Sequence, residues 1–550
     1  MLLPDLPYDI LELVFHQLDA RSATVCGELC RKFRAFITTS LPVQYKIALA
    51  RRGMSAGRNE SIDLAERLAK VEQYERAWRE ASWEESFALS LLPPRDNCKI
   101  LRSQGYMLLW TARTSTVRLI RLPSPLCGIT SEEHVWCLPS NVSRHRDDEG
   151  NPTNLYPLMD VDSDLIIFVD ASGGPEAEVQ LLYPRSLLTG DIHPWCAGAV
   201  EFSLKIPSTF GHLGAVDLHN RYISLGAVDE SGPFMVYDWL KRKKVIQFDN
   251  PVKTSFLGFF DGMRFLTFAT DESGRCCALE VYDLGLLSEE PPTSDAAPRV
   301  PITHRFELPF HQVGTTLARY DEETWALLPN SANRSDCASY FREDELITIY
   351  FPFMQGRAAL MNYTITMTFD LSALISSLHI SSSDHPGTRN GMHVIPWNNW
   401  HGRVRIGVLP SPFSTDIAIT GWRVIPDLPS LNDGHVEVRV HDSHPLRTRR
   451  AGDSSATPSC EVVRCKCELT GLNSRKLWDP PLNHTLLATD YVVHTIKLPS
   501  SSAGSSIGNK THRAFFSRDA IIIMEYRLPD ISGRWVEGFG LTSITAYQLV

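Results

Sequence analysis

The sequence predicts an α+β multidomain protein, in which a small helical domain and a helical linker precede a large all-β domain. Apolar residues recur at helical spacing from the N-terminus to about residue 83. After Pro93-Pro94 the pattern changes to short alternating runs that are rich in β-branched and aromatic residues and broken by Gly, Pro, Asn and Asp. We therefore expect a helical domain over residues 1–45, a linker over 46–92 and a β domain over 93–550.

Length, charge and cysteine usage limit the class of protein. A chain of 550 residues is too long for one small core. Its net charge of −10 argues against nucleic acid as the main partner, and no apolar run approaches the roughly 20 residues of a membrane span. The first residues lack the basic region of a secretory signal, and the twelve cysteines form no disulfide framework. A cytoplasmic and/or nuclear location is expected.

The first 37 residues predict short amphipathic helices. Pro7 suits a first helical turn, and one apolar stripe follows it at helical spacing: Ile10, Leu11, Val14, Phe15 and Leu18. Ser22 suits the cap of a second helical run, whose apolar positions continue to Ile37 while Arg31, Lys32 and Arg34 take the polar side. Such helices expose more apolar surface than they can cover by themselves, so we expect them to dock onto a partner.

Two strings of residues in this stretch resemble an F-box. They are Leu6-Pro7-x-Asp9-Ile10-Leu11-x-x-Val14-Phe15-x-x-Leu18 and Cys26-x-x-Leu29-Cys30-Arg31-x-Phe33-Arg34. Asp9 stands where Glu is commoner, and Phe33 stands where Trp is commoner. The resemblance implies docking onto the Skp-type adaptor of SCF (cullin–RING) ubiquitin ligases, and through it onto the cullin and RING subunits. The alternative is an ordinary helical hairpin that packs on its own domain.

The resemblance also implies which residues bind the adaptor. The expected anchors are Leu6, Pro7, Ile10, Leu11, Val14, Phe15 and Leu18. Three further residues, Leu29, Cys30 and Phe33, are expected to be divided between the domain's own core and the partner.

The linker is predicted to contain two helices. Residues 44–54 form the first, and the second begins near Ser61 and continues through Trp83. These helices resemble those that follow the F-box in a large fungal group. The long helix would act as a rigid spacer or would pack flat on the β domain, and the sequence leaves both arrangements open.

A recurring unit points to the architecture of the β domain. Strands ending near Tyr-Asp recur, and Asp238 and Asp283 are 45 positions apart, close to the period of about 40–45 residues of a β-propeller blade. The repeats resemble degenerate WD-type blades. We predict a β-propeller of six to eight blades, with seven favoured. A β-sandwich or two β domains are the alternatives.

No residue pattern predicts catalysis, a metal site or a cofactor. The Gly-x-Ser-x-Gly match at 504–508 lacks the strand before it and the helix after it that a nucleophile elbow needs. Cys460, Cys465 and Cys467 lack the paired spacing of a zinc site. Among four predicted surface loops, 140–154, 288–301, 443–458 and 499–510, the third carries Arg447, Arg449 and Arg450, which could receive an acidic or phosphorylated segment.

The sequence thus favours a non-catalytic substrate receptor of an SCF-type ubiquitin ligase, with the F-box on the adaptor and the β domain on an unknown target protein. The first alternative is a propeller enzyme or ligand-binding propeller whose N-terminal helices serve only packing. The second is an F-box protein that works outside ubiquitination.

Overall fold

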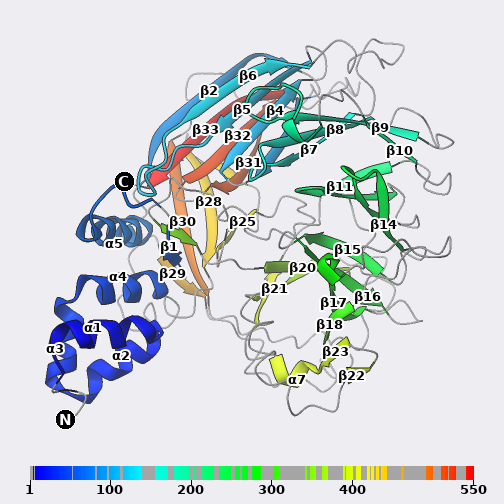
Figure 1. Ribbon diagram of the computed structural model, residues 1–550. Helices are drawn as coiled ribbons and strands as arrows, with labels where there is room; N and C mark the ends of the chain where they lie inside the picture. Colours follow the sequence, from blue (N-terminus) through cyan, green and yellow to red (C-terminus); the bar gives the residue numbers. More distant parts are fainter. Residues whose placement is uncertain are drawn as a thin grey trace.

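The computed structural model begins with a group of helices, and a large β region follows (Figure 1). The structure describes residues 4, 6–52, 54–57, 59–80, 83–95, 98–103, 105–111, 115–138, 155–170, 179–196, 202–205, 213–227, 234–248, 254–259, 263–270, 276–286, 302–308, 341–343, 347–354, 362–369, 388–389, 392–400, 404–410, 418–420, 423–425, 429–432, 435–442, 460–463, 491–499, 510–517, 520–527 and 540–549.

Four short helices form the N-terminal domain: α1 (Tyr8–Gln17), α2 (Ala20–Leu29), α3 (Arg31–Thr39) and α4 (Leu41–Ala50). Asp19 caps α2 by accepting a 2.7 Å hydrogen bond from the backbone N–H of Ser22. The Cys30 sulfur accepts from the backbone N–H of Phe33 at the start of α3. The fourth helix begins at Leu41 rather than at the predicted residue 44, because Pro42 lies in its first turn, where no N–H partner is needed.

The linker ends earlier than the sequence predicted. After β1 (Met54–Ala56), helix α5 (Leu64–Glu80) stops before Trp83, and strand β2 (Trp83–Arg95) follows. The expectation of helix through Trp83 and of a helical linker to residue 92 is therefore corrected. The reason is non-local, since β2 pairs antiparallel with the last strand, β33 (Gly540–Leu549), whose hydrogen bonds satisfy the β2 backbone.

The next part of the chain forms four sheets, in each of which four consecutive strands pair antiparallel in chain order. The first sheet contains β3 (Cys98–Ser103), β4 (Tyr106–Thr111), β5 (Thr116–Arg121) and β6 (Glu132–Cys137). The second contains β7 (Leu155–Asp160), β8 (Leu165–Asp170), β9 (Val179–Ser186) and β10 (Phe202–Lys205). The third contains β11 (Leu213–His219), β12 (Tyr222–Ala227), β13 (Phe234–Asp238) and β14 (Lys243–Phe248). The fourth contains β15 (Thr254–Phe259), β16 (Arg264–Thr270), β17 (Cys276–Asp283) and β18 (Ile302–Glu307), extended by β23 (Met392–Ile395) and β22 (Thr388–Arg389).

The described residues form three more sheets of at least three strands. The fifth contains β20 (Ile347–Met354), β21 (Asn362–Phe369) and β24 (Arg405–Pro410). The sixth contains β25 (Ala418–Thr420), β26 (Arg423–Ile425), β27 (Ser430–Asn432), β28 (His435–Asp442), β29 (Cys460–Val463) and β30 (Tyr491–Pro499). The seventh contains β31 (Lys510–Ser517), β32 (Ala520–Arg527), β33 and β2. Strand β19 (Phe341–Glu343) pairs with β1, and α7 (Trp397–Trp400) follows β23.

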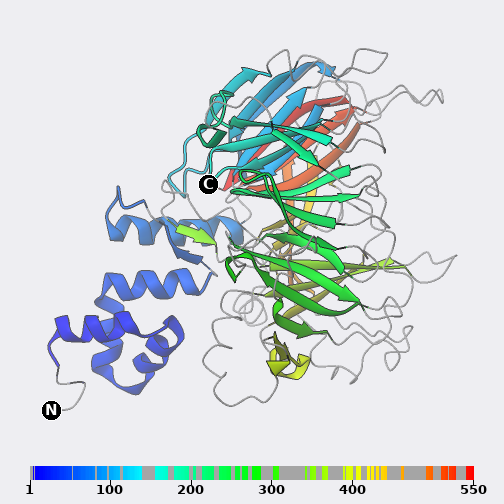
Figure 2. The same ribbon diagram turned by 45° about the vertical axis from the view of Figure 1, so that its right-hand side comes forward.

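These sheets are arranged as a β-propeller, which confirms the predicted fold class. The first strands β3, β7, β11 and β15 contact one another in succession, and β25 contacts β31, so the first strand of each of these sheets faces its neighbour. The seventh sheet joins β2 from the start of the β region to three strands from its end, which closes the ring. Figure 2 shows the sheets following one another around the molecule. The number of blades stays a prediction.

One face of the ring carries the helices. Strand direction alternates within each sheet, so the turns from first to second strand and from third to fourth strand lie at the same edge, and we call this side of the ring the turn face. Trp78 of α5 contacts the rings of Trp83 and His494, which lie near turn-face ends of the seventh and sixth sheets. The long helix therefore packs on the β domain rather than standing away from it as a spacer.

A buried ion pair fixes α5 on the sixth sheet. Arg423 and Asp442 are 2 % and 1 % exposed, and Nε of Arg423 lies 3.4 Å from Oδ2 of Asp442. Nη1 of Arg423 donates a 2.7 Å hydrogen bond to the hydroxyl of Tyr74, and the guanidinium lies 4.1 Å from the centre of the Trp78 ring. One cation thus joins the helix to two strands.

We expect Arg423→Gln to lower the free energy of unfolding by roughly 3 kcal/mol, because it leaves the Asp442 carboxylate buried without its cation. Urea unfolding and limited proteolysis near α5 measure the effect. The control is Arg439→Gln, whose side chain is 61 % exposed on β28. An Arg423 variant that unfolds at the same urea concentration as the control would contradict this role.

Two aspartates join neighbouring sheets, Asp160, which is buried, and Asp217, which is partly exposed. Oδ2 of Asp160, at the end of β7, accepts a 2.6 Å hydrogen bond from the backbone N–H of Asn220. Oδ2 of Asp217 in β11 accepts a 3.0 Å bond from the backbone N–H of Phe259 at the end of β15. Burial raises the pKa of Asp217 to about 6, with a further rise from the charge of Asp160, although the N–H groups of Phe259 and Leu218 lower it.

This pKa predicts a stability that falls as pH rises from about 4 to about 6, since over this range the folded chain holds a proton on Asp217 that the unfolded chain has lost. Below the unfolded pKa of 3.8, Asp217 is protonated in both states, and it no longer lowers the stability. Asp217→Asn should flatten this part of the pH profile, measured as the unfolding midpoint at each pH. An unchanged slope in the variant would show that other groups cause it.

Candidate protein-interaction site

The helical domain has a small core of its own. Its buried side chains come from all four helices and include Leu11, Phe15, Ala23, Phe33, Phe36, Val43 and Ile47. The ring of Phe15 lies 5.6 Å from that of Phe33 and 5.2 Å from that of Phe36, centre to centre. These contacts allow the domain to fold before any partner binds.

This core divides the residues that the sequence assigned to the adaptor. Leu11, Phe15 and Phe33 are buried inside the domain, and Leu6, Leu18 and Cys30 pack against that core while partly exposed. Val14 is also partly exposed, whereas Pro7, Ile10 and Leu29 are exposed. Leu11 and Phe15 are buried because a domain this small must bury one side of α1 in its own interior, and their contact with the adaptor stays a prediction.

A second apolar group lies on the domain surface. It consists of Tyr8, Ile10, Leu13, Val25, Leu29 and Leu41, which we call the exposed apolar set. Their exposed fractions run from 40 % at Leu41 to 69 % at Leu29. The sequence interpretation missed Tyr8, Leu13, Val25 and Leu41, although Ile10 and Leu13 show the i, i+3 spacing of a second helical stripe. Six large exposed apolar side chains on so small a domain are typical of a protein that binds a partner.

Lysine side chains hold α1 in place. Nζ of Lys46 in α4 donates to the carbonyl oxygens of His16, at 2.8 Å, and Leu18 at the C-terminal end of α1. A cation at the last carbonyls of a helix is stabilised by the helix dipole. Nζ of Lys32 donates to the carbonyl oxygen of Leu6, just before α1. Both ends of the helix that carries Ile10 and Leu13 are therefore tied to neighbouring helices.

The metal, anion-binding and nucleophile candidates of the sequence form no site among the described residues. No group of His, Cys, Asp or Glu that could hold a metal ion occurs in the part of the chain that the structure describes. Cys460 lies in β29, while Cys465, Cys467, the three arginines at 447–450 and the Gly-x-Ser-x-Gly match lie outside the described residues. No helix among the described residues is both long and apolar enough to cross a membrane.

Comparison with known proteins identifies the helical domain. Residues 3–44 match the family model of the F-box domain, so the predicted resemblance is confirmed, and these helices are an F-box domain. No curated protein matches the chain.

Solved structures resemble the chain only distantly. Drosophila Semaphorin 1a, extracellular domains 1-2, is 11 % identical with a TM-score of 0.37, over 85 % of this chain and 89 % of that one. The C-terminal WD40 domain of Sif2 is 10 % identical with a TM-score of 0.31, over 85 % of this chain and 98 % of that one. AztD from Citrobacter koseri is 10 % identical with a TM-score of 0.30, over 82 % of this chain and 89 % of that one. At these TM-scores the likeness carries no argument about function.

Substitutions separate the core of the F-box domain from its surface. Phe15→Ala should destabilise the domain by about 3–5 kcal/mol, because it removes a buried ring and its two aromatic contacts. Leu29→Ala should change the stability by less than about 0.5 kcal/mol, because Leu29 is exposed. Hydrogen exchange of α1–α3 in the full chain measures both. Equal protection in the two variants would contradict this division.

Proposed function

We propose that this chain is the substrate-recognition subunit of an SCF-type (cullin–RING) ubiquitin ligase. The F-box domain binds the Skp-type adaptor, and the β-propeller binds the target protein. The exposed apolar set supports this assignment most directly, because it leaves large apolar side chains in water on a domain that already has a complete core. An adaptor groove that covers this set gives the side chains the burial that the chain itself does not provide.

The binding is of the helix-in-groove kind, in which apolar side chains from helical faces enter a complementary surface. Ile10 and Leu13 lie on α1, Val25 and Leu29 on α2, so each of the two helices offers exposed apolar side chains to a partner. Burying one such side chain fully contributes about 1.5–3 kcal/mol, of which part is offset by the loss of freedom on association. Several anchors are therefore enough for a stable complex.

The propeller would hold the target at a set position relative to the ligase. The contacts of Arg423 with Tyr74 and Trp78 support this role, since they fix α5 on the β domain. The receptor then needs no chemistry of its own, because its contribution is to place a lysine of the target near the ligase's catalytic subunits. We therefore infer a non-catalytic protein without cofactor, and with no nucleic-acid or membrane partner.

The alternative of a propeller enzyme needs acids, histidines or metal ligands that converge on one site. Among the described residues no metal-binding group meets this requirement, and the F-box domain would be left without a purpose. The receptor function is accordingly favoured. The receptor function implies a cytoplasmic and/or nuclear location. The free cysteines of the described residues are compatible with such a reducing compartment.

Adaptor binding can be tested with charges placed on the surface and not in the core. Ile10→Asp/Leu29→Asp should abolish association of the full chain with a purified Skp-type adaptor, because each substitution forces a carboxylate into an apolar contact. Leu11 is unsuitable for this test, since a charge there would unfold the domain.

The matched control is Val135→Asp, on the β-propeller, where Val135 is 58 % exposed. It should bind the adaptor like the unaltered chain. Calorimetry measures the affinities, and circular dichroism confirms that the variants are folded. If the unaltered chain fails to bind the adaptor, or the double variant binds equally well, the proposed function is wrong.

A further inference from the structure

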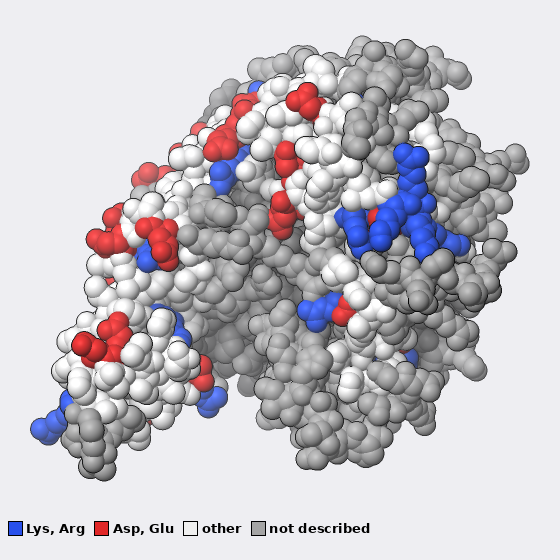
Figure 3. Space-filling view, viewed as in Figure 1, with Lys and Arg blue, Asp and Glu red and all other residues white. Residues whose placement is uncertain are grey.

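The turn face carries a basic cluster at a distance from the helices. It consists of Arg221, Lys241, Arg242, Lys243, Lys244 and Arg264. Arg221 follows the first strand of the third sheet. Lys241 and Arg242 connect its third and fourth strands, and Lys243 and Lys244 begin the fourth. Arg264 begins the second strand of the fourth sheet. Figure 3 shows Lys and Arg gathered over the region of β14, whereas Asp and Glu gather over β2 and α5. In a chain of net charge −10, this separation concentrates positive charge on one region.

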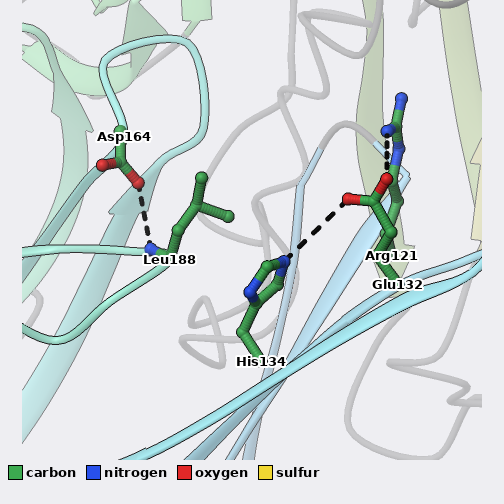
Figure 4. Close-up of polar contacts among 5 residues, drawn as sticks. All are labelled: Arg121, Glu132, His134, Asp164 and Leu188. Carbon is green, nitrogen blue, oxygen red and sulfur yellow. Dashed lines mark hydrogen bonds and ion pairs between the residues drawn. The ribbon is translucent and has the colours of Figure 1, made fainter.

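The cluster contacts an acidic and an amide side chain. Asp238 lies 3.4 Å from Nε of Arg221, and Lys244 donates to the side chain of Gln247. Asp238 and Asp283 are the acidic residues of the described turns in these two sheets that accompany the six cations. In the first sheet, by contrast, Arg121 on the same face is paired with Glu132 at 3.4 Å, and Glu132 also lies 3.9 Å from His134 (Figure 4). Among the described residues, cations therefore outnumber carboxylates on the turn face of the third and fourth sheets.

The backbone at Arg242 is strained. Its φ of 53° lies in the left-handed region, which glycine and asparagine occupy much more readily than a long side chain does. The turn between β13 and β14 thus holds an arginine where folding alone would favour glycine. Strain of this kind is often kept at sites that bind something.

Exposed apolar side chains surround the cluster on the same face. Of the five large apolar side chains that are exposed on the described β region, four lie on turn-face connections: Leu188 and Trp195 between β9 and β10, Met263 between β15 and β16, and Leu286 between β17 and β18. The ring centre of Trp195 is 6.4 Å from that of Trp239, and Trp239 lies two residues before Lys241. Apolar groups thus flank the cations on both sides.

These apolar side chains stand on ordered turns. The backbone N–H of Leu188 donates a 3.0 Å hydrogen bond to Oδ1 of Asp164, as Figure 4 shows. The backbone N–H of Trp195 donates to Nδ1 of His193 at 3.3 Å. The carbonyl of Met263 accepts a 2.7 Å bond from the N–H of Leu284, close to Leu286. Turns fixed in this way present side chains with little loss of freedom when a ligand binds.

We propose that the turn face of the second to fourth sheets binds an anionic segment of the target protein that also carries aliphatic or aromatic side chains. The proposal rests on the receptor function proposed above and adds the class of target to it. Carboxylates or phosphates of the segment pair with the basic cluster, and its apolar side chains contact Trp195, Leu188, Met263 and Leu286. The helix α5 packs on the same ring face, so a segment bound there lies on the side of the F-box arm.

A protein segment fits this surface better than a nucleic acid does. Separate apolar side chains between charges suit the alternation of acidic and apolar residues in a peptide. The overall negative charge of the chain opposes a long polyanion, which would extend over the acidic regions beside β2 and α5.

The test selects ligands for the full-length chain from a displayed library of random peptides of about twelve residues, a length that can extend across neighbouring turns. Selected peptides should be enriched in Asp and Glu together with Leu, Phe or Trp. Their affinity, measured by fluorescence anisotropy, should fall about tenfold or more in Lys241→Gln/Arg242→Gly/Lys243→Gln, and it should fall with added salt. Glycine at 242 relieves the backbone strain, so this variant should remain folded.

Controls separate the surface from general electrostatics. Arg439→Gln/Lys497→Gln removes two exposed cations from the sixth sheet and should leave peptide affinity unchanged. Trp195→Ala should weaken binding through the apolar part alone. Replacing Glu by phosphoserine in a selected peptide distinguishes a phosphorylated segment from an acidic one. Peptides that lack acidic residues, equal binding by the triple variant, or tighter binding of a single-stranded oligonucleotide would each overturn the proposal.

The same variants distinguish this proposal from the receptor function. The triple variant at residues 241–243 should bind the Skp-type adaptor normally, and Ile10→Asp/Leu29→Asp should bind the selected peptides normally. If the unaltered chain binds the peptides through the basic cluster but not the adaptor, the receptor function fails while the binding surface stands. If it binds the adaptor but no acidic peptide, only the surface proposal fails.

Discussion

The pairing of β2 with β33 is the contact on which the arrangement of the molecule depends. It joins the first strand of the β region to the last, so that the ring closes only when both ends of the chain are in place. Because β2 follows α5 after two residues, closure also sets where the helical arm leaves the ring. Trp83, at the start of β2, contacts Trp78 of α5, and Arg423 joins the same helix to the sixth sheet. The position of the F-box domain relative to the propeller is therefore a consequence of how the ring closes.

Local pattern predicted much of this chain, and the errors share one physical cause. The strings around Leu6–Leu18 and Cys26–Arg34 identified the F-box because its helices and their spacing are encoded by neighbouring residues. The recurring strands predicted a propeller for the same reason. The helix through Trp83 was wrong because the competing structure depends on a partner more than 450 residues away, which periodicity cannot detect. The burial of individual residues in α1 could not be predicted, since its apolar stripe does not tell which of Ile10 and Leu11 faces the domain's core, and the adaptor residues stay a prediction.

The F-box domain balances two demands on its apolar residues. Leu11, Phe15 and Phe33 make a core that holds four short helices together, and α1 is also held by Lys32 and Lys46. Ile10, Leu13 and Leu29 remain in water and are available to a partner. A domain that buried all of them would be more stable but would have nothing to bind with, and one that exposed all of them would not fold alone. The interface is thus organised before the partner arrives, which lowers the ordering cost of association.

The helix α5, which leads to the F-box domain, and the basic cluster lie on the same face of the ring, the turn face. The alternation of strand direction places the contacts of α5 and the basic cluster at the same edge of their sheets, although they belong to different parts of the ring. Closely packed sheets have low compressibility, so the separation between the helical arm and the basic cluster is set by the fold and not by the ligand. A receptor that performs no chemistry can act only through position. A ring that carries the F-box arm and the proposed binding surface on one face meets that requirement, and in our proposal the target lies at the basic cluster that contains Lys241 and Lys244.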